Sequence, residues 1–338
     1  MSEIRLSKSA YFHNLEAITN KVGSKDRIFI ILKDDAYAHG IEEMSVLAKE
    51  FGIKTAVVRN ESEALKIKDN FEKIIILSHI ADGSEKENFI YAINHINALN
   101  IIKSGSKVHL AIDTLMHRNG LNLEEINEAF KLAKARNIQI QGAYTHFRSS
   151  DEKSAEFFVQ KENFKEAKEI FKNLAKEFGI ENFIFHSHNS AATERESDFE
   201  DEAVRVGIAQ FGYAQFDESL NLKRVLSLHA HKISQRVLKK GQSIGYGGTY
   251  EAKEDLKVAT YDLGYGDGLF RYAGVGELKL ANGKNILGKM SMDSFSCEDS
   301  GDEICVFDDA RVWSKFFGTI EYDVLVKLKP WIRKKIID

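Results

Sequence analysis

Lys33 follows an unbroken apolar run and is the first residue in this sequence whose position suggests chemistry. The run 28–32 (IFIIL) contains no polar residue. It therefore predicts a strand buried on both faces, as in a parallel sheet. A lysine directly after such a strand is expected at the carboxyl edge of the sheet, where α/β folds keep their sites. An ordinary lysine that extends from the strand end into solvent would fit the local pattern as well.

A second candidate is the segment 186–192 (HSHNSAA), which follows the apolar stretch from Phe183. It predicts a strand end followed by the first turn of a helix, with Asn189 and Ser190 at the junction. Free N–H groups and the helix dipole at such a junction favour phosphate. Simple capping of the helix by either side chain fits the same pattern and is compatible with anion binding.

The elements that must position these residues alternate regularly over the first 220 residues. Helical and extended patterns follow one another at a spacing typical of a parallel α/β fold, and the length fits a (β/α)₈ barrel. Predicted strands cover 28–32, 54–58, 73–79, 108–113, 138–146 and 183–188, and predicted helices cover 9–23, 41–51, 61–69, 123–136 and 156–178.

The pattern changes near residue 223. The predicted strands 225–237, 257–263, 276–280 and 303–313 are joined by turns without long helices. This predicts a second, mostly antiparallel β domain. We therefore expect residues 1–222 to form the barrel and 223–338 the β domain.

Composition excludes several classes of protein. The chain has 338 residues, 43% of them hydrophobic, and a formal net charge of −4, which favours neither nucleic acid nor an anionic membrane as partner. No run reaches the ~20 apolar residues of a membrane span. Two cysteines in a chain of this length, with no apolar signal region at the start, predict a cytoplasmic protein. No cluster of metal-ligating residues is expected.

The segment around Lys33 carries a resemblance to a known family. Residues 33–40 (KDDAYAHG) resemble the K-A-N-A-Y-G-H-G segment of alanine racemases, which bind pyridoxal 5′-phosphate (PLP). Lys33 matches the lysine that holds PLP as a Schiff base, and Tyr37 matches a further cofactor-binding residue. Asp34, Asp35 and Ala38 depart from the pattern.

The segment 113–118 (DTLMHR) resembles the family's D-T-G-M-G-R. Arg118 matches the arginine that holds the phenolic oxygen of PLP and the substrate carboxylate. Leu115 and His117 replace both glycines. Ala111 stands where the family commonly carries a lysine, often carbamylated, that orients this arginine, so its acidic partner is missing or supplied differently.

Further barrel motifs follow in the family's order: THF at 145–147, HSHNSAA at 186–192 and RVGI at 205–208. The resemblance implies that Arg205 faces the pyridine nitrogen, and arginine donates a hydrogen bond there without protonating the ring fully. The residues it assigns to the cofactor from these motifs are His146, Asn189, Ser190, Arg205, Gly207 and Ile208. Arg148 is unusual at its position.

The C-terminal half carries the remaining motifs, SIGYGGTY at 243–250, GYGDG at 264–268, LGKMSMD at 287–293 and IEYD at 320–323. Tyr246 matches the family's second catalytic base. Racemisation removes a proton from one face of Cα and delivers one to the other face, and Lys33 with Tyr246 would supply one base to each. The resemblance assigns Tyr265, Met292 and Asp293 to the substrate and Tyr322 to the cofactor.

The resemblance covers residues 3–335 and implies a PLP-dependent racemase that interconverts L- and D-alanine and supplies D-alanine for peptidoglycan. It also implies a homodimer in which each β domain completes the partner's site. Two alternatives stay open. One is an amino-acid racemase of broader specificity and the same fold, and the other is a non-catalytic PLP-binding protein.

Overall fold

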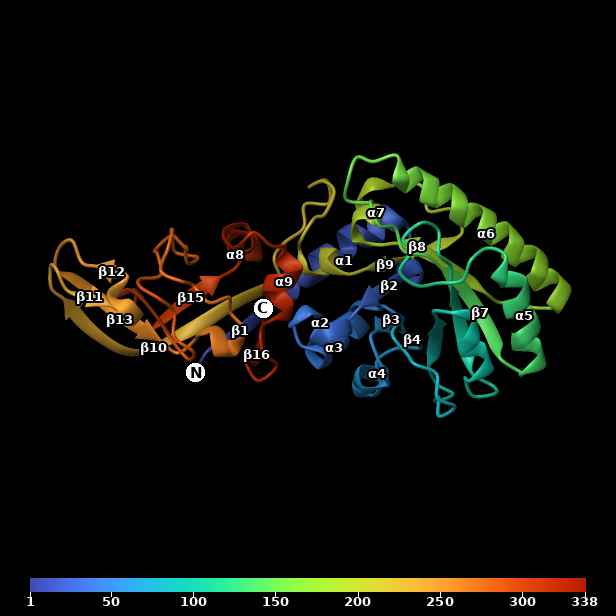
Figure 1. Cartoon of the computed structure of the whole chain (residues 1–338), viewed down its shortest axis with the longest axis horizontal. Helices are drawn as coiled ribbons and strands as arrows, with labels where there is room; N and C mark the ends of the chain where they lie inside the picture. The colour runs from blue at the N-terminus through green and yellow to red at the C-terminus, as the bar shows by residue number, and fades with distance from the viewer. The chain divides into compact units, whose positions relative to one another are not determined.

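The computed structural model describes residues 1–338 and divides into two compact units. We call residues 12–34 and 44–222 the barrel unit, and residues 1–11, 35–43 and 223–338 the sheet unit. Figure 1 shows the barrel strands in blue to yellow-green and most of the sheet unit in orange and red. No helix combines the length and the apolar character needed to span a membrane.

The barrel unit contains a closed parallel barrel of eight strands, in which β9 pairs with β2 to close the ring. Every residue of β2 and β3 is buried, and for β2 the unbroken apolar run predicted this. The barrel strands are β2 (Ile28–Ile31), β3 (Thr55–Val58), β4 (Lys73–Ile76), β5 (Ile90–Ile93), β6 (Lys107–Ala111), β7 (Gln139–Tyr144), β8 (Ile184–His188) and β9 (Glu202–Val206).

The longest helix, α6, shows why the helices cover this barrel. Its buried residues recur every three or four positions, and the helix ends at Gly179 with a left-handed φ of 72°. Figure 1 shows α5 beside α6 on the outside of β7, and Phe130 and Phe171 pack with ring centroids 5.0 Å apart. The helices are α1 (Lys8–Val22), α2 (Lys33–Tyr37), α3 (Ile41–Phe51), α4 (Glu61–Ile67), α5 (Glu125–Ala135), α6 (Glu156–Phe178), α7 (Ser190–Arg195), α8 (Ala310–Phe317) and α9 (Glu321–Val326).

The sheet unit is built on a six-stranded sheet with the order β14-β13-β10-β1-β16, and β15 also pairs with β10. All pairs are antiparallel except β1 with β16. The strands are β1 (Glu3–Ser7), β10 (Leu226–Leu238), β13 (Leu256–Tyr261), β14 (Phe295–Glu298), β15 (Glu303–Phe307) and β16 (Arg333–Ile337), with the hairpin β11 (Ser243–Ile244) and β12 (Tyr250–Glu251).

The predicted fold class, a (β/α)₈ barrel followed by a mostly antiparallel β domain, is confirmed. Two local predictions are wrong. The predicted strand 276–280 forms only the single bridge Lys279 to Asn285. The predicted strand 303–313 ends at Phe307, because the Asp309 carboxylate accepts the Arg311 N–H and caps α8.

Candidate active site

A cavity of about 430 Å³ lies in the barrel unit, and Lys33 lines it. Its other walls come from residues at or just after the carboxyl ends of strands, among them Leu77 after β4, Ala111 at the end of β6 and Tyr144 at the end of β7. This is the edge where barrels of this class keep their sites. The predicted site residues Arg118, His146 and Arg205 also line this cavity, so the structure brings them together with Lys33.

Arg205 is the most deeply buried of the cationic side chains that line the cavity. It is 4% exposed, and its guanidinium donates to the carbonyl oxygens of His186, Thr145 and Ser187 at 2.5, 2.6 and 3.2 Å. Burial lowers the pKa of Arg205 to about 10. The guanidinium therefore stays protonated at neutral pH, and it donates hydrogen bonds without accepting any.

His186 continues the contacts of Arg205 into the barrel. Arg205 Nη1 lies 3.0 Å from His186 Nδ1, and His186 Nε2 lies 2.8 Å from His109 Nδ1. Burial and the charge of Arg205 lower the pKa of His186 well below its ordinary value, and burial lowers that of His109 to about 3. Both rings are therefore neutral at pH 7. The Tyr144 ring stacks on the His186 ring at 4.9 Å.

Sequence reasoning missed His109. It is a buried polar residue of β6, two positions before Ala111, and a histidine inside a predicted strand was the available signal. Gly142 on the neighbouring strand makes room for it. A Cβ at position 142 would collide with the Ile184 carbonyl oxygen and would lie 3.1 Å from His109 Nε2.

His146 is the third imidazole near Arg205. Its Nδ1 lies 3.4 Å from Arg205 Nη2. Burial, together with the charges of Arg205, Arg118 and Lys33, lowers the pKa of His146 to about 3. His146 is therefore neutral and can accept a hydrogen bond in a site that holds several cations.

Ser190, the first residue of α7, gathers two backbone donors. Its Oγ accepts the N–H groups of Gly207 at 3.1 Å and Ala209 at 3.2 Å. Asn189 instead caps α7, because its Oδ1 accepts the Ala192 N–H at 3.0 Å. The sequence offered capping and anion binding as joint possibilities. The structure assigns the capping bond to Asn189 and the converging donors to Ser190.

The segment after Lys33 has an unusual backbone. Residues 34–38 all have φ between 52° and 63°, so α2 forms a left-handed turn of non-glycine residues. Such a conformation costs roughly 1–2 kcal/mol per residue and persists only where contacts determine it. Asp34 contributes on one side, because its N–H donates to Glu63 at 2.6 Å and its carboxylate accepts from Arg59 at 3.0 Å.

Asp35 contributes contacts within the sheet unit. Its Oδ1 accepts the Ile41 N–H at 2.9 Å, and its Oδ2 lies 3.0 Å from Lys334 Nζ. Tyr37 is buried, and its ring packs against that of Tyr322 at 5.7 Å. The two aspartates that depart from the family motif therefore both hold the left-handed turn.

The C-terminal motifs gather in the sheet unit. The Gly266 N–H donates to the Met292 carbonyl at 2.7 Å, and a Cβ on Gly264 would collide with that carbonyl oxygen, so Tyr265 lies beside Met292 and Asp293. A Cβ on Gly245 would lie 3.2 Å from the Lys289 N, which brings the turn of Tyr246 to the same segment. Tyr246 is 62% exposed and Met292 55% exposed.

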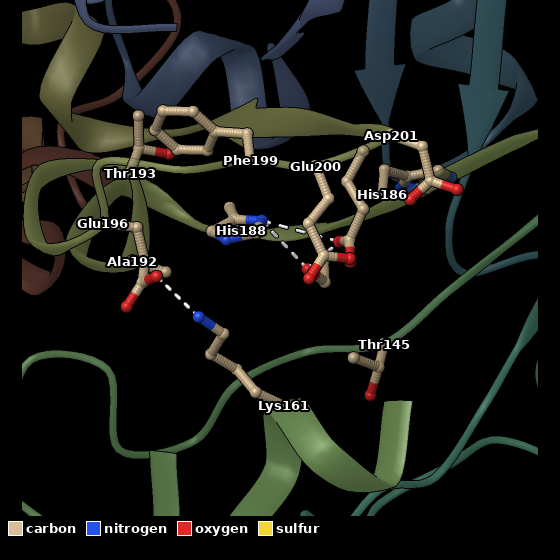
Figure 2. Close-up of polar contacts among 12 residues, drawn as sticks. Thr145, Lys161, His186, His188, Ala192, Thr193, Glu196, Phe199, Glu200 and Asp201 are labelled. Atoms are coloured by element: carbon tan, nitrogen blue, oxygen red, sulfur yellow. Dashed lines mark hydrogen bonds and ion pairs between the residues drawn. The ribbon is translucent and has the colours of Figure 1, made fainter. Parts of the chain in front are cut away.

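A second polar cluster lies along β8 and β9 on the side of α6, apart from the cavity lining. Because of a register shift between His186 and His188, their side chains point in different directions. Lys168 Nζ contacts the carboxylates of Glu200, Asp201 and Glu202 within 3.1 Å. Figure 2 shows Lys161 paired with Glu196, and His188 Nδ1 lies 3.5 Å from the Glu202 carboxylate. Because the lysines neutralise these carboxylates, we read the cluster as structural ion pairing.

Comparisons with known proteins agree over the whole chain. Residues 6–215 match the family model described as alanine racemase, N-terminal domain, and residues 225–336 match alanine racemase, C-terminal domain. An alanine racemase of Campylobacter curvus is 61% identical over 337 residues and covers 100% of both chains.

Solved structures give the same result for the fold. An alanine racemase of Clostridium difficile 630 superposes with a TM-score of 0.90 at 23% identity, over 99% of this chain and 95% of that one. A structure of alanine racemase from Bartonella henselae, with covalently bound pyridoxal phosphate, has a TM-score of 0.83 at 20% identity and covers 99% of each chain.

Proposed function

Because the chain belongs to the alanine racemase family, we propose that it interconverts L-alanine and D-alanine with PLP as cofactor. One observation supports this most directly. Lys33, Arg118, His146 and Arg205 line one cavity at the carboxyl edge of the barrel. Such a cavity combines an amine with several cationic or hydrogen-bonding groups, as an anionic cofactor and an amino-acid carboxylate require.

The residues present fit PLP. Ser190 Oγ and the N–H groups of Gly207 and Ala209 converge within 3.2 Å and would hold a phosphate. The buried Arg205, protonated at neutral pH, would donate a hydrogen bond to the pyridine nitrogen. The Lys33 amine would anchor the cofactor covalently. We propose supporting contacts from Tyr37, His146, Asn189, Ile208 and Tyr322.

We propose that Lys33 and Tyr246 are the two bases. Bound PLP would withdraw electrons from Cα of the amino acid and so acidify its proton. Lys33 Nζ would take or deliver this proton on one face of Cα, and Tyr246 Oη would do the same on the other. Arg205 would limit this electron withdrawal, because it would donate a hydrogen bond to the ring nitrogen and keep its own proton. Arg118 would hold the carboxylate, with Met292, Asp293 and Tyr265 at its border.

We also propose a symmetric homodimer with shared active sites. Tyr246 and Met292 are large side chains with exposed fractions of 62% and 55%. Both belong to segments that lie together in the sheet unit, and a second copy that covers them would remove apolar surface from water. In this arrangement Tyr246, Tyr265, Met292 and Asp293 act on the cavity of the other copy.

The proposal also covers the roles of the two domains and the compartment in which the reaction takes place. Residues 1–222 would bind the cofactor, and residues 223–338 would carry the second base. The reaction would take place in the cytoplasm and supply D-alanine for peptidoglycan, without nucleic-acid or membrane partners. Because Leu115 and His117 replace both glycines of the motif that ends at Arg118, one alternative stays open, an amino-acid racemase of broader specificity. A panel of amino acids distinguishes the two.

The deciding experiment follows proton exchange at Cα of L-alanine in heavy water, with a chiral readout of D-alanine and the Lys33→Ala variant as control. Entry of deuterium and appearance of D-alanine, both lost in the variant, would support the racemase. Binding of PLP without exchange on alanine or on the amino-acid panel would contradict it. That result would favour a non-catalytic PLP-binding protein.

A further inference from the structure

The loop that leads to Arg118 has a strained backbone. Leu115 has φ of +139° and His117 has φ of +54°. Residues with a side chain rarely adopt these values, least of all a bulky one such as leucine. The ends of the loop are closed by two backbone hydrogen bonds, from Asp113 to Leu121 at 3.0 Å and from Leu121 to Ala111 at 2.8 Å. Some set of contacts must therefore hold the residues between them.

Asp113 supplies the contacts on the inside of the loop. Its Oδ1 accepts the N–H groups of Leu115 at 3.1 Å and His117 at 3.0 Å, and its Oδ2 lies 3.1 Å from His117 Nδ1. One carboxylate thus satisfies both strained residues. It leaves their carbonyl oxygens to other partners.

Arg148 supplies the contact from outside. Its Nη1 donates to the Leu115 carbonyl at 2.9 Å, and its Nε and Nη2 donate to the two carboxylate oxygens of Glu156 at 2.9 and 2.6 Å. This two-pronged pair fixes the plane of the guanidinium. Since Glu156 begins α6, the Leu115 carbonyl is anchored to the longest helix of the barrel unit.

Arg118 itself has no such anchor. It is exposed and lines the cavity, and its guanidinium has no hydrogen-bond or ion-pair partner within the chain. Ala111, another residue of the cavity lining, packs in an apolar cluster with Ala92 and Tyr144. The one carboxylate in the lining, that of Asp113, bonds to Leu115 and His117 and forms no ion pair with the Arg118 guanidinium. The direction in which Arg118 enters the cavity depends on the backbone of the preceding loop.

We propose that Arg148 is a positioning residue for Arg118. It holds the Leu115 carbonyl and so keeps residues 115–117 in the strained conformation that directs Arg118 into the cavity. It thereby sets the affinity of the site for the substrate carboxylate. The inference rests on the proposed function, because that proposal gives Arg118 the carboxylate to bind.

The first test compares Arg148→Ala with Arg136→Ala. Arg136 is the matched control, because its guanidinium also donates to two backbone carbonyls, those of Asn100 and Ile102, yet it does not line the cavity. We expect Arg148→Ala to raise KM for alanine about tenfold and to change kcat less than about threefold. Arg136→Ala should change neither.

A second readout does not depend on activity. Hydrogen exchange measured by mass spectrometry on a peptide covering 113–121 should be faster in Arg148→Ala, because the Leu115 and His117 amides lose their fixed geometry. It should be unchanged in Arg136→Ala. Arg148→Lys is a second variant that should still fold, because it keeps a positive charge beside Glu156. It loses the planar guanidinium that donates to Glu156 and Leu115 together. It should show the same rise in KM.

A separate experiment tests whether Arg148 acts by holding the strained backbone of Leu115. Glycine adopts positive φ without cost, so Leu115→Gly should let the loop keep its shape without Arg148. The rise in KM on Arg148→Ala should then fall to less than half of its value in the Leu115→Gly background. An equal rise in both backgrounds would overturn the proposed route.

The outcomes separate this inference from the proposed function. If the unaltered protein does not racemise alanine, the proposed function fails, and the exchange experiment alone decides whether Arg148 holds the loop. Unchanged exchange and unchanged KM in folded Arg148→Ala or Arg148→Lys would overturn the inference while leaving the racemase intact. An equal effect of Arg136→Ala would reduce Arg148 to a general stabilising residue.

Discussion

Arg205 Nη1 lies 3.0 Å from His186 Nδ1, and this contact fixes the proton of the buried imidazole. A guanidinium only donates, so Nδ1 accepts and Nε2 carries the hydrogen. His186 Nε2 therefore donates to His109 Nδ1 across 2.8 Å. A cavity residue is thus connected, by two hydrogen bonds of defined direction, to a side chain in the middle of β6.

Because His186 donates a hydrogen bond to His109, we expect His109 to contribute to the stability of the fold. His109→Leu removes the acceptor of a buried N–H and should lower the free energy of unfolding by about 1–3 kcal/mol. Urea unfolding measures the change. His95→Leu is the matched control, because His95 is exposed and forms no cap hydrogen bond; it should stay within about 0.5 kcal/mol. Equal effects of the two substitutions would contradict the assigned hydrogen bond.

Glu194 predicts a dependence of stability on pH. It is 1% exposed, and burial raises the pKa of its carboxyl from 4.5 to about 7, although the N–H groups of Phe216 and Gln215 act to lower it. Between pH 4.5 and 7 the folded state therefore holds a proton that the unfolded state has lost. The contribution of this group to stability falls as pH rises through that window, by about 3 kcal/mol in total.

Glu194→Gln replaces the titrating carboxyl by a neutral amide and so tests the direction of this pH dependence. Compared with the unaltered protein, the variant should be more stable by about 2 kcal/mol at pH 8, and this advantage should disappear at pH 4.5. Urea unfolding at both pH values gives the difference. Glu177→Gln, on the exposed side of α6, should show no such dependence. A constant offset between Glu194→Gln and the unaltered protein would disprove the assignment.

The left-handed turn after Lys33 predicts that a glycine substitution there costs less stability than the same substitution in an ordinary helix. Ala38 is buried with φ of 63°, so Ala38→Gly should change the free energy of unfolding by less than about 1 kcal/mol. Ala38→Val adds a β-branched side chain to the same backbone and should cost about 2 kcal/mol. Ala129→Gly in α5 is the control and should cost at least about 1 kcal/mol. Thermal or urea unfolding gives all three values.

Shared active sites predict complementation between two inactive variants. Lys33→Ala should abolish turnover, and Tyr246→Phe should lower kcat by about 10²–10⁴ while PLP still binds. When equal amounts are mixed and allowed to exchange subunits, half of the sites in each mixed dimer have both bases. Activity should then recover to about a quarter of that of the unaltered protein.

The reading of this experiment depends on where Tyr246 acts. If Tyr246 served the cavity of its own chain, every site in the mixture would lack one base and no activity would return. Sedimentation of the mixture, alongside the assay, establishes that dimers are present. Recovery without dimers would contradict the shared site.

The sequence predicted the barrel well because its signals are local. The buried strand before Lys33 and the amphipathic α6 follow from runs and periodicities within a few turns of chain. The strands β5 and β9 were not predicted. β9 contains Glu202 and Arg205, whose charges are satisfied only by residues far away in sequence, such as Lys168 and His186. A strand of this kind has no local pattern to read.

The candidate site, too, was predicted only where the signal is local in the sequence. Motifs placed Lys33, His146 and Arg205, and the structure puts all three at one cavity. The roles of Asp34, Asp35 and Arg148 could not be predicted from the sequence, because each depends on a partner far away in the chain: Arg59, Lys334 and the Leu115 carbonyl. The strand expected at 276–280 failed for a related reason. Gly274 and Gly276 take positive φ, which local propensity does not reveal.

Gly142 has a consequence for how this chain can change over generations. Any side chain there would collide with the Ile184 carbonyl oxygen and would also crowd His109. The backbone of the neighbouring strand therefore requires the glycine, and replacing His109 alone would not free position 142. Among descendants of this protein, position 142 should stay glycine even where position 109 varies.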